Sequence, residues 1–407
     1  MINAYALESG FSEETFSAFM AALHASGISD IWLVTGKPIW GKLHGNLVHL
    51  TNRVIQDSEI RIIVTWIYGA NAVTVMGSAK PIDERYTIQL LHSTVDRANE
   101  ISNVMGLPGK LERSASQNKR LAFRFNGVSG HTPKGRGFSL SLRSIPLDLP
   151  LLDDMGLPPA LRSSFSETKG VTLVVGETGS GKSTLLAALM HDKLLNSRNR
   201  HIITIENPIE FDLQGVRSNH NFVVQHEIGP DLPSFYSGIV NSLRQAPTDI
   251  LVGEARDKES IDGLIAASET GHDTYATVHA SSVVGAFRRI ANEYETAAQP
   301  QIIFKLLSQI RLVVVQVLLI AKAGGRRVPI REWFYFDDSY RDELMRMDSE
   351  SALNDLGDRI RAQGQTMRQQ VLRAYLDDKV SLTEVRKIAG NFSEEELQGL
   401  KQTEEIT

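Results

Sequence analysis

The chain contains the stretch Gly176-Glu177-Thr178-Gly179-Ser180-Gly181-Lys182-Ser183, which matches the phosphate-binding pattern G-x-x-x-x-G-K-[ST]. Residues 171–175, just before it, are apolar and mostly β-branched, which predicts a buried parallel strand. Residues 184–190, just after it, are good helix formers. A strand, a glycine-rich loop and a helix in this order predict a nucleoside triphosphate site. The alternative is a glycine-rich turn that only caps a helix.

The chemistry of such a loop depends on where its unpaired amides point. Glycines let the backbone wrap closely around a polyphosphate, so the N–H groups of the loop and of the first helical turn point at its oxygens. We expect the Lys182 ammonium against the β- and γ-phosphates, and the Ser183 hydroxyl as a direct ligand of Mg²⁺. The predicted nucleotide-binding residues are Gly176, Glu177, Thr178, Gly179, Ser180, Gly181, Lys182, Ser183 and Thr184.

Composition limits the classes of protein that this chain can belong to. Its 407 residues are 42% hydrophobic and 22% charged, enough for two or three sizeable cores. The formal net charge of −5 does not indicate a nucleic-acid binder. The chain has no cysteine, which excludes disulfides and cysteine-ligated zinc or iron–sulfur sites.

Hydropathy predicts neither a signal peptide nor a transmembrane segment. Residues 1–10 lack a basic region followed by an apolar core. The most hydrophobic run, residues 312–321, has about half the length that spans a bilayer, so we predict a core strand there. Any membrane association is therefore expected to be peripheral or through a partner.

Residues 1–148 are predicted to form an α+β domain with a small antiparallel sheet. A Gly-, Pro- and Lys-rich segment predicts a loop at residues 127–137, and the helix and strand signals conflict over residues 69–120. The predicted elements are helices at 12–25 and 58–68 and strands at 31–35, 39–43, 47–50, 121–126 and 138–144.

A cluster of prolines between residues 146 and 159 predicts a domain boundary, with a linker at 149–158. Apolar strands then alternate with helical segments over residues 159–340, which predicts an α/β domain whose mostly parallel sheet is covered on both faces. The strands are expected at 171–175, 202–205, 250–253, 274–278 and 312–320. A polar helical tail follows at 341–407, with capping sequences at 381–384 and 393–396.

Two acidic residues follow apolar strands of the predicted parallel sheet. Glu254 ends the run 250–254 and Glu206 ends the run 203–206. The carboxyl ends of parallel strands face the ligand crevice of an open α/β sheet, so both carboxylates can converge on the γ-phosphate. The alternative for each is a solvated acid at a strand end.

Two histidines and two arginines are weaker candidates when they are considered singly. His272 and His279 flank a predicted strand, and their spacing does not suggest a metal pair. Each alone is typical of a hydrogen-bonded core or loop histidine. Arg124 and Arg143 alone are typical of surface charges, and become functional only if they reach a phosphate.

Four motifs in order resemble the Walker A, Asp-box, Walker B and His-box of the secretion and pilus-retraction ATPases, the PilT-like and type II/IV secretion ATPases. They are the strings at 176–183, 205–211, 252–257 and 270–279. The resemblance extends upstream to residues 29–47 and 142–146, and covers roughly 28–337. It implies a RecA-like C-terminal domain and a PAS-like N-terminal domain.

Residues 326–332 and 336–338 are most similar to the DotB-like branch, which serves type IVB secretion and the related IncI-type conjugation (TraJ-like) systems. The zinc-bearing pilus-assembly branch needs four cysteines, which this chain lacks.

The resemblance also implies a role for each candidate. Glu206 activates water, Glu254 acts on Mg²⁺ through water, and His272 and His279 sense the γ-phosphate. Arg124 and Arg143 neutralise that phosphate. One position departs from the family pattern, because Asn207 stands where the Asp-box usually has an aspartate.

We therefore expect a Mg²⁺-dependent ATPase that binds ATP between its two domains and forms a homohexameric ring. The ring is expected to be cytoplasmic, to associate peripherally with the inner membrane through components of a secretion or conjugation complex, and not to bind nucleic acid directly. Two alternatives remain: a nucleic-acid motor of RecA-like fold, for which we find no basic track or stacking aromatics, and a nucleotide-gated assembly scaffold with little turnover, to which only Asn207 points.

Overall fold

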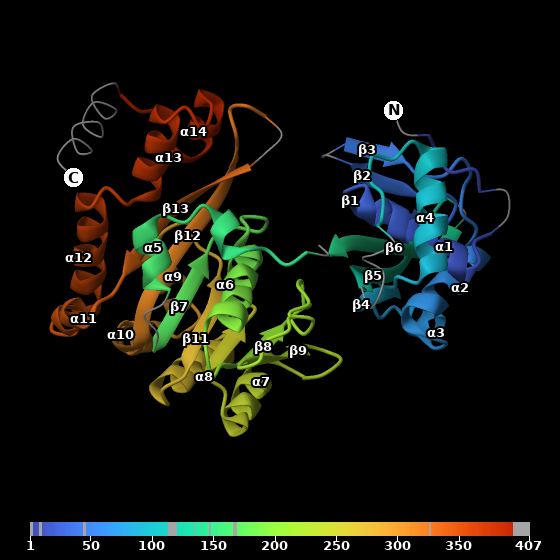
Figure 1. Cartoon of the computed structure of the whole chain (residues 1–407). Coiled ribbons are helices and arrows are strands. Elements are labelled where there is room, and N and C mark those ends of the chain that lie inside the picture. Colours follow the sequence, from blue (N-terminus) through green and yellow to red (C-terminus); the bar gives the residue numbers. More distant parts are fainter. Residues whose placement is uncertain are drawn as a thin grey trace. The chain divides into compact units, whose positions relative to one another are not determined.

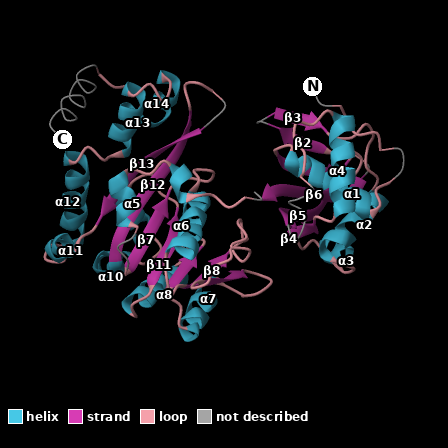
Figure 2. Cartoon of the chain, viewed as in Figure 1, coloured by secondary structure: helices cyan, strands magenta, loops and turns pink. Residues whose placement is uncertain are grey.

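The computed structural model describes residues 3–7, 10–43, 46–112, 120–133, 135–145, 148–165, 169–324 and 327–393. The chain divides into two compact units, Met1–Asp148 and Leu149–Thr407. Figure 1 labels their elements and Figure 2 distinguishes helices from strands. Each unit combines a β-sheet with helices around a core of its own, so the predicted mixed α/β fold is confirmed.

The first unit is built on a six-stranded antiparallel sheet in the order β3-β2-β1-β6-β5-β4. Its large buried side chains, including Phe16, Phe19, Phe123 and Phe125, come from both helices and strands. The Ser12 side chain caps the first helix by accepting a hydrogen bond from Thr15 N at 3.1 Å. The elements are α1 (Glu13–Ala25), β1 (Ile28–Val34), β2 (Trp40–Leu43), β3 (Asn46–His49), α2 (Asp57–Tyr68), α3 (Ala72–Gly77), β4 (Ile82–Gln89), α4 (His92–Met105), β5 (Arg120–Thr132) and β6 (Gly135–Ile145).

The prediction of a loop over residues 127–137 is wrong. β5 continues to Thr132 and β6 begins at Gly135, so the two strands form one long hairpin. Glycines suggested the loop, but the hairpin needs two of them for close packing. A Cβ on Gly137 would lie 2.8 Å from Thr35 Cβ, and a Cβ on Gly127 would lie 2.8 Å from Phe125 Cζ. Of the ambiguous stretch, residues 113–119 lie outside the described residues.

The second unit contains a seven-stranded sheet in the order β13-β12-β7-β11-β10-β8-β9. All neighbouring strands are parallel except β12 and β13, which confirms the prediction of a mostly parallel sheet. Two strands were not predicted, β9 and β13, both at edges of the sheet. The strands are β7 (Gly170–Val175), β8 (His201–Glu206), β9 (Phe222–Glu227), β10 (Asp249–Val252), β11 (Asp273–Val278), β12 (Ile310–Ile320) and β13 (Arg327–Tyr335).

Helices cover both faces of this sheet (Figures 1 and 2). One core lies between the sheet and η2, α5 and α6, and another between the sheet and the remaining α-helices. The helices are η2 (Leu152–Met155), α5 (Pro159–Ser164), α6 (Lys182–Asn196), α7 (Phe235–Ser242), η3 (Leu243–Gln245), α8 (Lys258–Glu269), α9 (Val283–Ala291), η4 (Thr296–Ala298), α10 (Gln299–Gln309), α11 (Asp338–Leu344), α12 (Ser349–Ala362), α13 (Met367–Leu376) and α14 (Leu382–Ala389).

The helices after residue 340 share a core with the sheet. Leu356, Val371 and Val385 are fully buried in the same cluster as sheet residues. Glu332 on β13 also links this segment to the sheet. Its carboxylate accepts hydrogen bonds from Val283 N at 2.5 Å and from Met367 N at 2.7 Å. These two residues are the first of α9 and α13. The predicted cap Ser381 opens α14, whereas the capping sequence at 393–396 extends beyond the described residues.

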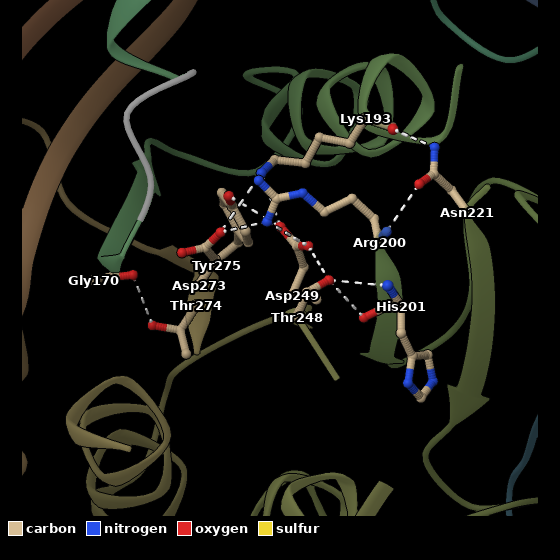
Figure 3. Close-up of polar contacts among 10 residues, drawn as sticks. All are labelled: Gly170, Lys193, Arg200, His201, Asn221, Thr248, Asp249, Asp273, Thr274 and Tyr275. Carbon is tan, nitrogen blue, oxygen red and sulfur yellow. Dashed lines mark hydrogen bonds and ion pairs between the residues drawn. The ribbon is translucent and has the colours of Figure 1, made fainter. Parts of the chain in front are cut away.

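A buried charge cluster holds α6 against the amino ends of the parallel strands (Figure 3). Lys193 Nζ on α6 lies 2.9 Å from Asp249 Oδ1 on β10. Arg200 Nη1, just before β8, lies 2.9 Å from Asp273 Oδ2 and 3.3 Å from Asp249 Oδ2. Burial raises the pKa of Asp273, with the neighbouring Asp249 carboxylate adding to the rise. Two cations and two carboxylates therefore balance each other at this edge of the sheet.

Replacing Asp249 by asparagine should destabilise the protein strongly, because two cations would then share one carboxylate in a buried site. We expect Asp249→Asn to lower the apparent free energy of unfolding by about 3–5 kcal/mol. The control is Asp358→Asn, which removes one partner of an exposed ion pair on α12 and should change it by about 0.5 kcal/mol or less. Urea unfolding followed by circular dichroism measures both, and equal effects would contradict the assigned role of the cluster.

Candidate functional site

The glycine-rich loop leaves β7 and enters α6, and its backbone needs three of its glycines. Gly176, Gly179 and Gly181 have φ values of +151°, +81° and +85°. Space is also short at two of them, because a Cβ on Gly176 would lie 2.4 Å from Gln316 O and a Cβ on Gly181 would lie 2.8 Å from Gln316 Nε2. The sequence pattern therefore corresponds to a backbone shape that L side chains rarely adopt.

Lys182 is the first residue of α6, and its side chain points back into the loop. Its Nζ donates to Gly176 O at 2.7 Å and to Glu177 O at 3.0 Å, and the residue is 8% exposed. Burial lowers the pKa of Lys182, while the negative charges of Glu254, Glu210 and Glu177 oppose that effect. The loop thus holds a cation close to the carboxylates at the strand ends.

The strands bring Glu206 and Glu254 to the same edge of the sheet as the loop. β8 and β10 are parallel neighbours with Ile205 beside Val252, and Gly253 N donates to Ile205 O at 2.7 Å. A Cβ on Gly253 would lie only 3.2 Å from Glu206 Cα. This close backbone approach holds the two acids next to each other, where the carboxyl ends of parallel strands form a ligand-binding edge.

Glu206 is held by two side chains that donate to the same carboxylate oxygen. Thr204 Oγ1 lies 2.6 Å and Gln225 Nε2 lies 3.1 Å from Glu206 Oε1. Burial raises the pKa of Glu206 to about 7, and the two hydrogen bonds partly offset that rise. A carboxylate with such a pKa can accept a proton near neutral pH. Gln225 could not be found from the sequence, because the strand β9 that carries it was not predicted.

The structure brings one of the two histidines to Glu254. His279 Nε2, just after β11, lies 3.5 Å from Glu254 Oε1, and Arg256 Nη1 lies 3.9 Å from Glu254 Oε2. His279 and Glu254 thus meet at the carboxyl edge of the sheet.

His272 lies at the opposite edge, so the structure does not bring it to the loop. It precedes β11, whose first residue Asp273 is level with Gly170 at the start of β7. The six residues of β11 separate it from His279 by roughly 20 Å along the strand. The His272 ring also has local partners, with Nδ1 3.0 Å from Thr270 Oγ1 and 3.0 Å from Ala267 O. Within one chain, His272 is therefore not placed to sense a phosphate bound at the loop.

The residues at this edge fit a magnesium ion held together with a nucleotide. Among the described residues, no group of three or more histidine, aspartate and glutamate side chains could hold a metal by itself. Ser183 in the first turn of α6 offers a hydroxyl, and Glu254 offers a carboxylate. Magnesium commonly takes few protein ligands and completes its shell with phosphates and water.

The two predicted arginines lie side by side in the first unit. Arg124 on β5 and Arg143 on β6 are direct cross-strand partners. Each has an acidic neighbour, with Arg124 Nη2 3.0 Å from Asp83 Oδ2 and Arg143 Nε 2.8 Å from Asp30 Oδ1. The register places Arg85 on β4 directly beside Arg124, in a stretch whose secondary structure the sequence left ambiguous. One face of the sheet thus carries three neighbouring guanidinium groups, where like charges oppose each other.

Comparison with known proteins gives a consistent set of relatives. The model of the family described as "Type II/IV secretion system protein" matches residues 116–387. The type IV pilus ATPase PilU of Pseudomonas aeruginosa is 38% identical over 190 residues, which cover 46% of this chain and 49% of PilU. The chain spans about half the length of the first curated relatives it matches.

Two X-ray structures of the ATPase DotB resemble almost the whole chain. The Legionella pneumophila protein superposes with a TM-score of 0.76 at 28% identity, over 95% of this chain and 99% of that chain. The Yersinia pseudotuberculosis protein gives a TM-score of 0.78 at 26% identity, over 96% and 97% of the two chains. No helix in the described part of the chain is long and apolar enough to cross a membrane.

The pKa of Glu206 provides a direct test of the site. Thr204→Val removes a hydrogen bond that favours the ionised carboxylate, so the pKa should rise from about 7 to a higher value. The carboxyl carbon resonance of labelled Glu206, assigned by its loss in Glu206→Gln, reports this titration. Thr270→Val, at the C-terminal end of α8 near His272, is the matched control and should leave the titration unchanged. An unchanged midpoint in Thr204→Val would contradict the assigned contact.

Proposed function

Because the chain belongs to the type II/IV secretion system protein family, we propose that it is a Mg²⁺-dependent ATPase that powers a secretion or conjugation apparatus. The observation that carries this proposal is the convergence of Lys182, Glu206 and Glu254 at the carboxyl edge of one parallel sheet. A phosphate-binding loop, a basic carboxylate and a carboxylate for the metal shell are the parts that nucleotide hydrolysis needs.

In the proposed reaction each residue has a separate task. The loop amides and Lys182 bind the β- and γ-phosphates. Ser183 would hold Mg²⁺ directly and Glu254 would hold it through water, and the ion would supply positive charge to neutralise the phosphates. Glu206 orients the attacking water and accepts its proton, for which a pKa of about 7 is suited. His279, beside Glu254, completes the polar edge that faces the γ-phosphate.

The first unit supplies positive charge in this proposal. Arg124 and Arg143 lie on adjacent strands and are expected to approach the transferred phosphoryl group when the units close on ATP. Charge on the phosphoryl oxygens spreads in the transition state, and guanidinium groups stabilise it. In this proposal domain closure is part of catalysis, and hydrolysis drives movement of the first unit.

We assign the chain to the DotB-like branch of type IVB secretion and conjugation ATPases, with a hexameric ring as the working form. The support is the likeness to two DotB structures over at least 95% of this chain. We further propose that the ring works in the cytoplasm, attached to the inner membrane through components of the apparatus. A scaffold with little turnover is less well supported, because Asn207 changes only one side chain beside an intact set of loop, base and metal-shell residues.

Removing single site residues should abolish turnover without unfolding the protein. We expect Lys182→Ala, Glu254→Gln and Glu206→Gln each to reduce steady-state phosphate release from ATP by about 100-fold or more. Lys305→Ala, an exposed lysine on α10, is the control and should keep the wild-type rate. Phosphate release at the wild-type rate in Glu206→Gln would exclude Glu206 as the base, and a negligible wild-type rate would favour the scaffold.

The ring is tested independently by native mass spectrometry with and without ATP. We expect a species of six chains in the presence of ATP. In the proposed ring, movement of the first unit in one chain is transmitted to the neighbouring chain. Lys182→Ala is the matched control, since a weakened triphosphate site should reduce the ATP-dependent fraction. A monomer under both conditions would contradict the ring.

A further inference from the structure

Arg331 on β13 is a buried cation that has only neutral partners. It is 6% exposed, and the described part of the chain supplies no carboxylate to it. Its guanidinium donates to Gln316 Oε1 at 2.7 Å, Met155 O at 2.7 Å and Gly156 O at 3.1 Å. Burial lowers the pKa of Arg331 to about 10. A buried charge without a counter-charge is costly, and an apolar side chain of similar size would pack there without that cost.

The charge has a specific effect on Gln316, its neighbour on β12. Gln316 is 3% exposed, and its amide could in principle take either of two orientations. Because Arg331 can only donate hydrogen bonds, it fixes the amide oxygen of Gln316 on its own side. The amide nitrogen then faces the loop and donates to Ser180 O at 2.7 Å.

This hydrogen bond orients a peptide group of the glycine-rich loop 176–183, the proposed phosphate-binding loop, which is called the phosphate loop below. In a planar trans peptide the C=O and the N–H point in opposite directions. With the Ser180 carbonyl held toward β12, the N–H of Gly181 points away from β12. Gly181 is also the N-cap of α6, where a free N–H carries the partial positive charge of the helix. The Gln316 contact therefore sets the direction of an anion-binding amide.

The hydrogen bonds of Arg331 also reach Met155 and Gly156, which lie just after the boundary between the units. Met155 ends η2 and Gly156 follows it with φ +58°, soon after the boundary at Asp148. Any movement that displaces this segment changes the carbonyls that Arg331 holds. Arg331 and Gln316 thus join the segment 152–156, near the start of the second unit, to the backbone of the loop.

We infer that Arg331 and Gln316 are positioning residues that couple the segment 152–156 to the phosphate loop by orienting the Gly181 amide. The inference rests on the proposed function for the identity of the ligand, ATP. It adds to that function a route by which the conformation of residues 152–156 changes affinity for the triphosphate. By the same route, bound triphosphate stabilises that segment.

The Gln316→Glu variant tests the orientation of the Gly181 amide without a large change in the stability of the protein. The carboxylate has nearly the same shape and forms an ion pair with Arg331, so the melting temperature should stay within a few degrees of the wild type. It cannot donate to Ser180 O, so affinity for a fluorescent ATP analogue should fall roughly 10- to 100-fold. Gln316→Met, which is neutral and also lacks the donor, should show a loss of similar size. Gln370→Glu on α13 is the matched control and should bind as the wild type does.

Each outcome of this titration decides between positioning and another cause. Wild-type affinity in both Gln316 variants would overturn the inference. Loss in Gln316→Glu but not in Gln316→Met would also overturn it, because negative charge would then be the cause. Failure of the wild type and the control to bind the analogue would instead reject the proposed function, so the two failures are distinguishable.

Hydrogen exchange on the full chain tests the link between Arg331 and residues 152–156. At saturating ATP analogue, the amides of residues 152–157 should exchange several-fold more slowly in the wild type than without nucleotide. In Arg331→Met, and in Arg331→Lys if the first variant is unstable, this nucleotide-linked protection should be lost while the loop amides stay protected. Full protection of residues 152–157 in a folded Arg331 variant would overturn the coupling.

Discussion

The parallel pairing of β7, β11, β10 and β8 is the constraint on which the rest of the second unit depends. Parallel strands in register end at the same edge of a sheet, and here the phosphate loop, His279, Glu254 and Glu206 follow those ends. Residues more than a hundred positions apart in the chain are thereby placed around one site. Gly253 tightens this arrangement, because its missing Cβ lets β10 end against the backbone of Glu206.

The two edges of the sheet are built in opposite ways. At the amino edge, ion pairs join two cations and two carboxylates: Lys193, Arg200, Asp249 and Asp273. Because these charges are already paired, this edge is poorly suited to bind a charged ligand. At the carboxyl edge, Lys182 binds loop carbonyls, and Glu206 is raised in pKa by its burial. The neutralised edge and the edge with the candidate site lie at the two ends of α6, which begins at the loop and reaches the charge cluster at Lys193 (Figure 3).

Sequence reasoning succeeded where local signals agreed and failed where they could be explained in two ways. The strands that precede the candidate site residues were predicted because each is a short, strongly apolar run. The glycines at 127 and 137 were misread, since close packing and turns both need glycine. The edge strands β9 and β13 were not predicted, because polar and charged residues interrupt their apolar pattern. Gln225 lies on β9 and donates a hydrogen bond to Glu206, so this contact was not predicted either. The resemblance to secretion and pilus-retraction ATPases, which four motifs suggested, is confirmed.

The sequence by itself determined the phosphate loop, the mostly parallel sheet and the family, because these depend on residue types at short, fixed spacings. Only the tertiary structure decided which candidates meet. It placed His279 beside Glu254 and His272 at the far edge, although the two histidines flank the same strand. It also showed that Gln316 and Arg331, more than a hundred residues after the loop, support its backbone. Spacing along the chain does not record the direction in which a strand runs through a sheet or which side chains pack behind a loop, and both depend on long-range packing.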